Sequence, residues 1–298
     1  MSSLTATFYT LGCKLNQLET ESIAQAFKQE GFLSVSWGTA ADLFIVNTCT
    51  VTSMAEQKAR RIIRKTLKEN QNSCLIITGC YAQLDRAALE ALAADVELAL
   101  GAEAGSLERR RFFVVSGDAK ASLLDLPCFL ADSACSSSEL PSLLHDFFNQ
   151  GSCSPASTDR FRFDANDFTF HSRASLKIQD GCDNVCTYCR VRIARGKSVS
   201  LSAAEALIRL QNLEKASYAE AVLTGINISR YTDPDDAGWI FLALSGYCCQ
   251  VQKASPYVFH QLSPIVLMSA LQKLSAIPVC SPIFIYLFNL AAMLFLKK

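Results

Sequence analysis

The sequence predicts an α/β protein, and three observations carry this prediction. Short runs of β-branched and aromatic residues alternate with helical periodicity over the first hundred residues, as in βαβ units on a parallel sheet. A second alternation of strand, loop, helix and strand occupies residues 173–223, and a stretch rich in serine, 117–160, separates the two. The 298 residues exceed the usual single domain of roughly 100 to 200 residues, so two domains are expected.

The predicted elements of the first part follow one another closely. Apolar and β-branched runs predict strands, and a period near 3.6 residues predicts helices. We expect strands at 7–11, 43–47 and 75–78, alternating with helices at 16–30, 53–69 and 85–94. In such a sheet, ligands gather at the carboxyl ends of the parallel strands.

Residues 117–160 and 173–223 have different sequence patterns from the first part and from each other. Serines and prolines recur over 117–160, which predicts a linker or insertion with one short helix at 140–148 and no packed core. A strand is expected at 173–178 and another at 220–223, with a helix at 201–213 between them. Ser202 and Glu205 form a capping box at the start of that helix. This order is the start of a (β/α) barrel or of an open sheet.

The charges cancel overall but are unevenly distributed. The chain has 28 basic and 28 acidic residues, which argues against attraction to nucleic acid or membrane by net charge. Local basic clusters are still candidates for RNA contact, and a solvated face explains them equally well. These clusters are Lys58, Arg60, Arg61, Arg64, Lys65 and Lys68 on one predicted helix, and Arg109, Arg110 and Arg111.

Thirteen cysteines in a chain without a secretory signal at its start indicate a cytoplasmic protein with reduced thiols. Cys182, Cys186 and Cys189 follow a predicted strand within eight residues, so their thiolates can converge on zinc or an iron–sulfur cluster. A structural zinc normally takes a fourth ligand, whereas three cysteines leave one iron of a 4Fe-4S cluster open for a substrate. A chance cluster of core cysteines is a third alternative.

A second set of cysteines is dispersed along the chain. Cys13, Cys49 and Cys80 each lie immediately beyond a predicted parallel strand. Because the carboxyl ends of parallel strands share one edge, cysteines far apart in sequence would meet there. We therefore expect a second site with three thiolates, although any one of these cysteines taken singly is more typical of a core residue.

Four segments together resemble the radical S-adenosylmethionine tRNA methylthiotransferases, in particular the branch that acts on threonylcarbamoyladenosine beside the anticodon. The resemblance covers residues 4–236. The segments are Gly12-Cys13-Lys14-Leu15-Asn16-Gln17, Val46-Asn47-Thr48-Cys49-Thr50-Val51, Thr78-Gly79-Cys80-Tyr81-Ala82-Gln83 and Lys177-Ile178-Gln179-Asp180-Gly181-Cys182. The resemblance implies an N-terminal methylthiotransferase domain at 4–116, a linker or insertion at 117–167, and the first part of a radical SAM barrel at 168–238.

The resemblance also implies cofactors and partners. Two 4Fe-4S clusters would bind the two cysteine sets: the cluster on Cys182, Cys186 and Cys189 would bind S-adenosylmethionine and cleave it to a 5′-deoxyadenosyl radical, which abstracts hydrogen at adenine C2. The cluster on the dispersed set would deliver the methylthio group. The partners would be tRNA with reductant and sulfur-donor proteins, without a stable membrane partner. Catalytic residues stay unassigned, and the residues implied to contact S-adenosylmethionine are Tyr188, Thr224, Gly225 and Asn227.

One segment departs from the family. Apolar residues and a proline generally follow the third cysteine, where this chain has Arg190-Val191-Arg192-Ile193. The next residues, Ala194-Arg195-Gly196-Lys197-Ser198, keep the family's basic run. A non-catalytic iron–sulfur or zinc protein, which would keep the cysteines without using S-adenosylmethionine, is the alternative function.

Residues 239–298 differ in character from the rest of the chain, with four lysines as their only charged side chains. One interpretation is a membrane tail anchor, because 276–296 is an uncharged run of about 20 residues followed by two lysines. We favour a shifted reading frame, since regrouped codons from Trp239 on permit strings similar to the family's next barrel segments. We then expect the chain as written to lack the later barrel strands and an RNA-binding domain, and to have little activity.

Overall fold

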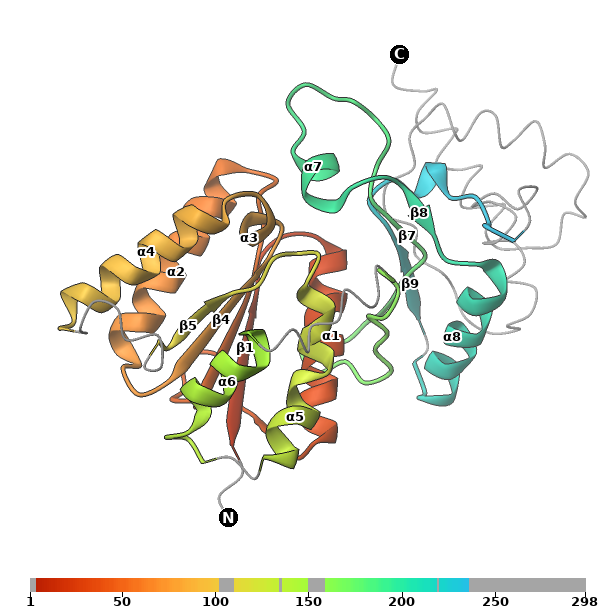
Figure 1. Cartoon of the computed structure of the whole chain (residues 1–298). Coiled ribbons are helices and arrows are strands. Elements are labelled where there is room, and N and C mark those ends of the chain that lie inside the picture. The colour runs from red at the N-terminus through yellow and green to blue at the C-terminus, as the bar shows by residue number, and fades with distance from the viewer. Residues whose placement is uncertain (1–3, 102–109, 134–135, 150–158, 219, 236–298) are drawn as a thin grey trace, which may run out of the picture. The chain divides into compact units, whose positions relative to one another are not determined.

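The computed structural model describes residues 4–101, 110–133, 136–149, 159–218 and 220–235 (Figure 1). They form two compact units. The first unit contains the described residues up to Phe170 together with Asp183–Gly196, and the second contains His171–Cys182 and the described residues from Lys197 on. The predicted shifted-frame or anchor segment at 239–298 lies outside the described residues. Within the described part of the chain, no helix is long and apolar enough to cross a membrane.

The first unit is built on a five-stranded sheet whose neighbouring strands are all parallel. The strand order is β2-β1-β3-β4-β5. This confirms the predicted α/β class with a parallel sheet. The strands are β1 (Thr5–Thr10), β2 (Leu33–Ser34), β3 (Leu43–Thr48), β4 (Cys74–Gly79) and β5 (Phe112–Val114).

Helices cover both faces of this sheet. Because side chains alternate along a strand, Leu43 and Ile45 of β3 join one apolar core, while Phe44 and Val46 join another. The first core receives residues of α1, α5 and α6, and the second receives residues of α2, α3 and α4 (Figure 1). The helices are α1 (Lys14–Gln29), α2 (Ser53–Glu69), α3 (Cys80–Leu84), α4 (Arg86–Ala99), η2 (Lys120–Leu124), α5 (Leu126–Asp132) and α6 (Leu140–Asn149).

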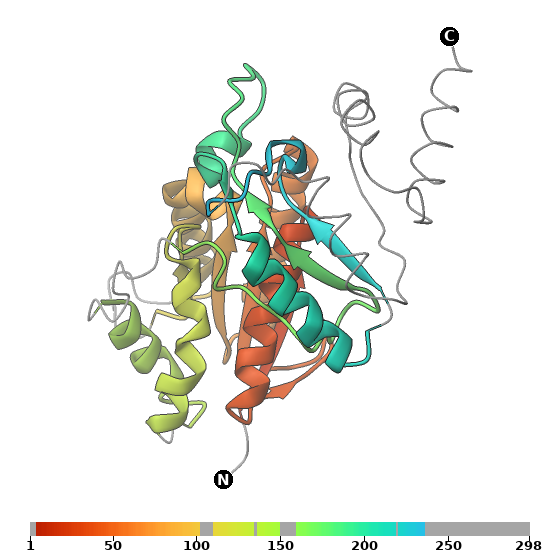
Figure 2. The same cartoon turned by 90° about the vertical axis from the view of Figure 1, so that its right-hand side faces the viewer.

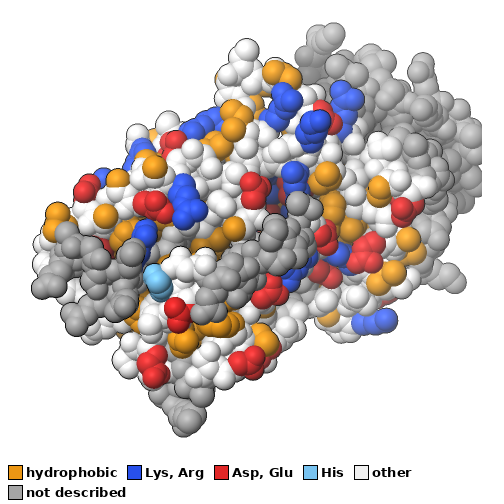
Figure 3. Space-filling view, in the orientation of Figure 1, with side chains coloured by type: hydrophobic (Ala, Val, Ile, Leu, Met, Phe, Trp, Pro, Cys, Tyr) orange, Lys and Arg blue, Asp and Glu red, His pale blue; other side chains and the backbone are white. Residues whose placement is uncertain are grey.

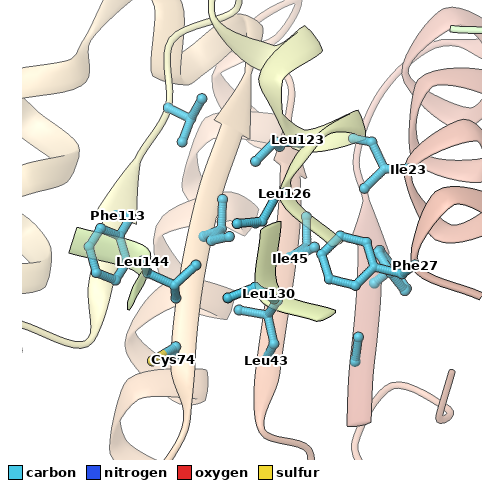
Figure 4. Packing of buried hydrophobic residues seen from close by; sticks show 14 of the residues in the cluster. Ile23, Phe27, Leu43, Ile45, Cys74, Phe113, Leu123, Leu126, Leu130 and Leu144 are labelled. Carbon is cyan, nitrogen blue, oxygen red and sulfur yellow. The ribbon is translucent and has the colours of Figure 1, made fainter. Parts of the chain in front are cut away.

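The expectation that the stretch from 117 onward has no packed core is wrong for its described part. Leu123, Leu126, Leu130 and Leu144 are buried in the first core together with Ile45 of the sheet (Figure 4). The predicted helix at 140–148 is present as α6. Serine-rich composition is misleading here because apolar residues recur every three or four positions between the polar ones, which is enough for one buried helix face.

Helix α2 of the first unit begins at a side-chain cap. Thr52 caps α2, and its hydroxyl oxygen accepts the amide of Ala55 at 3.1 Å. The helix then spans 53–69 as predicted. Five elements were not predicted from the sequence, because they have two to seven residues each and are too short for a periodic signal: β2, β5, α3, η2 and α5.

The second unit contains one β-α-β unit, which is how a (β/α) barrel opens. Strands β6 (Ala174–Lys177) and β9 (Ala221–Thr224) pair in parallel, with α8 (Ala203–Lys215) connecting them (Figure 2). Ser202 caps α8 by accepting the amide of Glu205 at 3.3 Å, as predicted. The remaining elements of the segment 179–230 are β7 (Gln179–Asp180), β8 (Val199–Ser200), α7 (Val191–Arg195), which belongs to the first unit, and η3 (Ile228–Arg230).

Candidate iron–sulfur and cofactor site

The three dispersed cysteines lie at the carboxyl edge of three adjacent strands. Cys13 is the N-cap of α1 just after β1, Cys49 follows β3, and Cys80 begins α3 directly after β4. In the register of β3 and β4, Thr48 is opposite Gly79, so Cys49 and Cys80 extend neighbouring strands from the same level. The sheet thus brings together one cysteine from each of three loops that are distant in sequence.

Two glycines let these loops approach closely. Gly12 has φ +107°, and a Cβ built there would lie 2.7 Å from the Cys49 Sγ. Gly79 has φ +101°, and its Cβ would lie 2.2 Å from the Thr48 carbonyl oxygen. Only glycine adopts such a backbone conformation without strain and leaves this space open. Both glycines are therefore required by the packing around the cysteines.

Buried polar side chains connect the three loops to one another. The Asn16 Nδ2 donates to the Leu11 carbonyl at 2.8 Å and to the Thr48 carbonyl at 3.1 Å, which joins the loops after β1 and β3. The Thr48 hydroxyl donates to the Thr78 carbonyl at 2.5 Å and accepts the amide of Ala82 at 3.3 Å, which joins β3 to β4. Buried polar groups that are fully paired in this way hold a single geometry.

The side chains at this edge include soft metal ligands. Cys13, Cys49 and Cys80 are free thiols. Burial raises the pKa of Cys49, the Val51 amide lowers it, and electrostatic interaction with Cys80 and Cys13 raises it. As they stand, no three His, Cys, Asp or Glu side chains of the described ranges converge closely enough to hold a metal ion. The fit to an iron–sulfur cluster therefore rests on the donor set, three free thiols at one sheet edge.

A buried ion network lies beside this edge. Lys120 Nζ is 2.6 Å from Glu19 Oε2 and donates to Asn47 Oδ1 at 3.1 Å. Arg195 donates to Glu19 Oε1 at 2.9 Å and to Asn16 Oδ1 at 2.6 Å. Asn16 lies in α1, three residues after Cys13, and Asn47 lies in β3, two residues before Cys49. The network thus connects the cysteine edge to η2 and to the segment 183–196.

The second cysteine motif falls in both units. Cys182 belongs to the second unit and is half-buried, whereas Cys186 and Cys189 belong to the first unit and are exposed. Tyr188, predicted to contact S-adenosylmethionine, has 89% of its surface exposed. Within the first unit, the Tyr188 ring is therefore largely unpacked.

In the second unit, two of the predicted site residues, Gly225 and Asn227, lie beside Gln179. The Gln179 side chain is buried, and its Oε1 accepts the amide of Asn227 at 2.8 Å. A Cβ on Gly225 would lie 2.8 Å from that same oxygen, so the space that Gly225 leaves is used by Gln179. Asn227 Nδ2 lies 3.9 Å from Cys182 Sγ, and Thr224 is buried at the end of β9.

The predicted basic clusters separate into structural and exposed residues. Arg60 donates to the Tyr81 hydroxyl at 2.6 Å. Arg111 pairs with Glu97 and donates to the Asn70 carbonyl, and Arg110 lies over the Phe112 ring. Arg109 lies outside the described residues. On the face that Figure 3 shows, Lys and Arg are interspersed with Asp and Glu. The members of the α2 cluster that are exposed are Lys58, Arg61, Arg64, Lys65 and Lys68.

Four residues of the site were not predicted from the sequence: Glu19, Lys120, Arg190 and Arg195. Glu19 could have been found from the sequence, because it shares the apolar face of α1 with Leu15 and Leu18, and a carboxylate buried on such a face requires a partner. Its partners could not be found in this way, since Lys120 lies 101 residues away along the chain and Arg195 lies 176 residues away.

Comparison with known proteins agrees with the resemblance in the cysteine segments. Residues 5–101 match the family described as "Uncharacterized protein family UPF0004". A threonylcarbamoyladenosine tRNA methylthiotransferase of Treponema pallidum is 39% identical over 259 aligned residues, which cover 74% of this chain and 53% of that protein. The chain is homologous to the threonylcarbamoyladenosine tRNA methylthiotransferases. The Bacillus subtilis protein of the same name is 34% identical and aligns with 76% of this chain and 44% of its own length.

The chain spans about half the length of the curated relatives it matches. Among solved structures, the radical S-adenosylmethionine methyltransferase TsrM of Kitasatospora setae is similar over 93% of this chain and 54% of its own, at 11% identity. Its TM-score of 0.39 is too low to specify a shared fold. The α/β assignment therefore rests on the parallel sheet itself.

Proposed function

We propose that the intact gene product is a radical S-adenosylmethionine transferase that methylthiolates C2 of N6-threonylcarbamoyladenosine in tRNA, beside the anticodon, and that the chain as written has little or none of this activity. The observation that supports the proposal is the position of Cys13, Cys49 and Cys80, each directly after one of three adjacent parallel strands, so that segments far apart in sequence each place a cysteine at one sheet edge. Homology to proteins that carry the name of this activity supports it.

Six cysteines would hold two 4Fe-4S clusters, Cys13, Cys49 and Cys80 one of them and Cys182, Cys186 and Cys189 the other. When bound, such clusters supply low-potential electrons for the cleavage of S-adenosylmethionine and the sulfur chemistry of the transfer. The protein's own contribution is positional. Asn16 and Thr48 hold the three loops in register, and the paired carboxylate of Glu19 keeps the neighbouring cations in place.

S-adenosylmethionine would contact Tyr188, Thr224, Gly225 and Asn227. Tyr188 offers an exposed aromatic face, which suits an adenine or a sulfonium group. Asn227 has its backbone amide held by Gln179 and its side-chain amide within reach of Cys182, so it can orient a ligand beside that thiol. We assign no catalytic acid or base.

The partners are tRNA, a reductant protein and a sulfur-donor protein, and we place the protein in the cytoplasm. The exposed cations of α2, including Arg61 and Arg64, are the candidate tRNA contacts, because phosphate recognition requires accessible positive charge. Arg110 and Arg111 are withdrawn from this set, since they pair within the first unit.

Anaerobic reconstitution of the full chain tests the proposal. We expect about eight iron atoms per chain and cleavage of S-adenosylmethionine under reduction, with little or no methylthiolation of tRNA by the chain as written. Replacing Cys13, Cys49 and Cys80 together with alanine should remove about half of the iron. Cys74→Ala is the matched control, because Cys74 is buried in the apolar core of β4 rather than at the edge. One tetrahedral zinc and no cleavage would instead indicate a non-catalytic binding protein.

A further inference from the structure

The segment Asp183–Gly196 carries two of the six cysteines, yet little apolar burial holds it in the first unit. Its helix α7 has five residues, and Ala194 is the one buried residue among them. Val185, Tyr188 and Ile193 are exposed. Isolated helices need roughly 12 to 15 residues to be even marginally stable in water. Contacts other than backbone hydrogen bonds and apolar packing must therefore order this segment.

Two arginines at the ends of α7 make such contacts. Arg190, the N-cap residue, lies 2.6 Å from Glu56 Oε1 of α2 and 2.7 Å from Asp85 Oδ2 at the end of α3. Arg195, the last residue of α7, lies 2.9 Å from Glu19 Oε1 of α1 and donates to Asn16 Oδ1. The two arginines thus attach α7 to helices that begin at or beside the three-cysteine edge.

The two attachments are unequal in burial. The Arg195 side chain is 8% exposed and its partner Glu19 is 3% exposed, with Lys120 on the other side of the same carboxylate. The Arg190 side chain is 41% exposed, and water screens its pairs with Glu56 and Asp85. Breaking a buried pair costs far more than breaking an exposed one, because the remaining charge stays buried.

We propose that Arg195 is a positioning residue. By pairing with Glu19, which also pairs with Lys120, it holds the segment that carries Cys186 and Cys189 against the rest of the first unit. Arg190 is a second and weaker attachment of the same segment. The Glu19–Lys120 pair lies within the first unit, and neither residue belongs to the segment 183–196. Arg195 brings a second positive charge to the same carboxylate and a hydrogen bond to Asn16, the residue that also joins the loops of Cys13 and Cys49.

Amide hydrogen exchange of the full chain, read by mass spectrometry, tests this proposal. The reporter is the peptide containing 183–196, whose Ala194 and Gly196 amides are hydrogen-bonded within α7. The reference is β3, which reports on global opening of the same unit. In Arg195→Ala we expect exchange of the reporter to rise by about tenfold or more, while β3 changes by less than about twofold.

Two matched variants sharpen the comparison. Arg192→Ala removes an exposed arginine from the same helix and should leave exchange unchanged. Arg190→Ala should raise exchange only about twofold to fivefold. Arg195→Lys keeps the positive charge but cannot contact Glu19 and Asn16 at the same time, as the guanidinium does, so its reporter exchange should lie between that of wild type and that of Arg195→Ala. This variant also tests the proposal if the alanine variant does not fold.

Reporter exchange in Arg195→Ala equal to that in Arg192→Ala would overturn the proposal. An equal rise in the reporter and in β3 would overturn it as well, because it would indicate a general loss of stability rather than undocking of the segment. Neither outcome depends on iron or S-adenosylmethionine. The proposed function is tested separately, by the reconstitution experiment.

Discussion

Lys120 and Glu19 form a buried ion pair across 101 residues of sequence, with Nζ 2.6 Å from Oε2. Both side chains are less than 5% exposed. The pair joins η2 to α1 beside the cysteine edge, and Arg195 shares its carboxylate. A single carboxylate thus organises three segments that the linear sequence separates.

Lys120→Met should therefore destabilise the chain by about 3 kcal/mol, because it removes one partner of a buried charge while keeping the volume of the side chain. Urea unfolding followed by far-UV circular dichroism measures the loss. Lys68→Met, at an exposed position of α2, should cost less than about 0.5 kcal/mol. Equal stability of the two variants would show that the pair contributes nothing.

Gly79→Ala should cost at least about 2 kcal/mol more than Gly38→Ala, because packing strain is added to the backbone strain. Both glycines have positive φ, +101° and +96°, so both variants carry the backbone penalty of about 1 to 2 kcal/mol. Gly38 has no atom within 4 Å of its ideal Cβ position, whereas Gly79 faces the Thr48 backbone. Thermal or urea unfolding compares them directly, and matching losses would contradict the close packing at the cysteine edge.

Asp42→Asn should lower the free energy of unfolding by about 1 kcal/mol near neutral pH. The loss is this small because the Asp42 side chain is partly exposed. Burial raises the Asp42 pKa, but hydrogen bonds from Ser137 and Thr5 outweigh it, and the folded-state pKa lies below the ordinary 3.8. Stability from a lowered carboxyl pKa is complete above the unfolded-state value and is lost as pH falls through the folded-state value.

Unfolding measured over a pH series checks this sign. The difference between wild type and Asp42→Asn should be constant from neutral pH down to the unfolded-state pKa and should shrink below it. A difference that grows as the pH falls would contradict the assignment.

Arg61→Gln/Arg64→Gln should weaken tRNA binding and reduce its salt dependence by about one logarithmic slope unit for each phosphate that is no longer neutralised. Both residues are exposed on α2, in the first unit. Lys28→Gln, on α1 at the opposite face of the sheet, is the control. Fluorescence anisotropy at several salt concentrations measures both quantities, and an unchanged slope would exclude α2 from the RNA contact surface.

Residues 239–298 lead to a prediction about the gene rather than the fold. We propose that they are read in a shifted frame, so that the nucleotides from codons 234 to 240 onward should encode barrel segments of the family in another phase. Genomic sequencing of this region decides the matter. Stop codons that close the alternative phase shortly downstream would refute the shift and return the anchor interpretation to consideration.

Much of the architecture could be predicted from local sequence. The helix at 53–69 and the strand at 43–48 have strong periodic or apolar signals, and Thr52 and Ser202 are good caps. The placement of Cys13, Cys49 and Cys80 just after strands followed from the same signals, because position after a parallel strand specifies a place at the sheet edge.

The sequence by itself therefore determined the α/β class, the family segments and the shared edge of three cysteines. Only the tertiary structure decided that the serine-rich stretch from 117 supplies part of the core, and that Lys120 and Arg195 converge on Glu19. The physical reason is distance along the chain. Local patterns report which face of an element is apolar, but the partner of a buried charge is chosen by packing between segments more than a hundred residues apart.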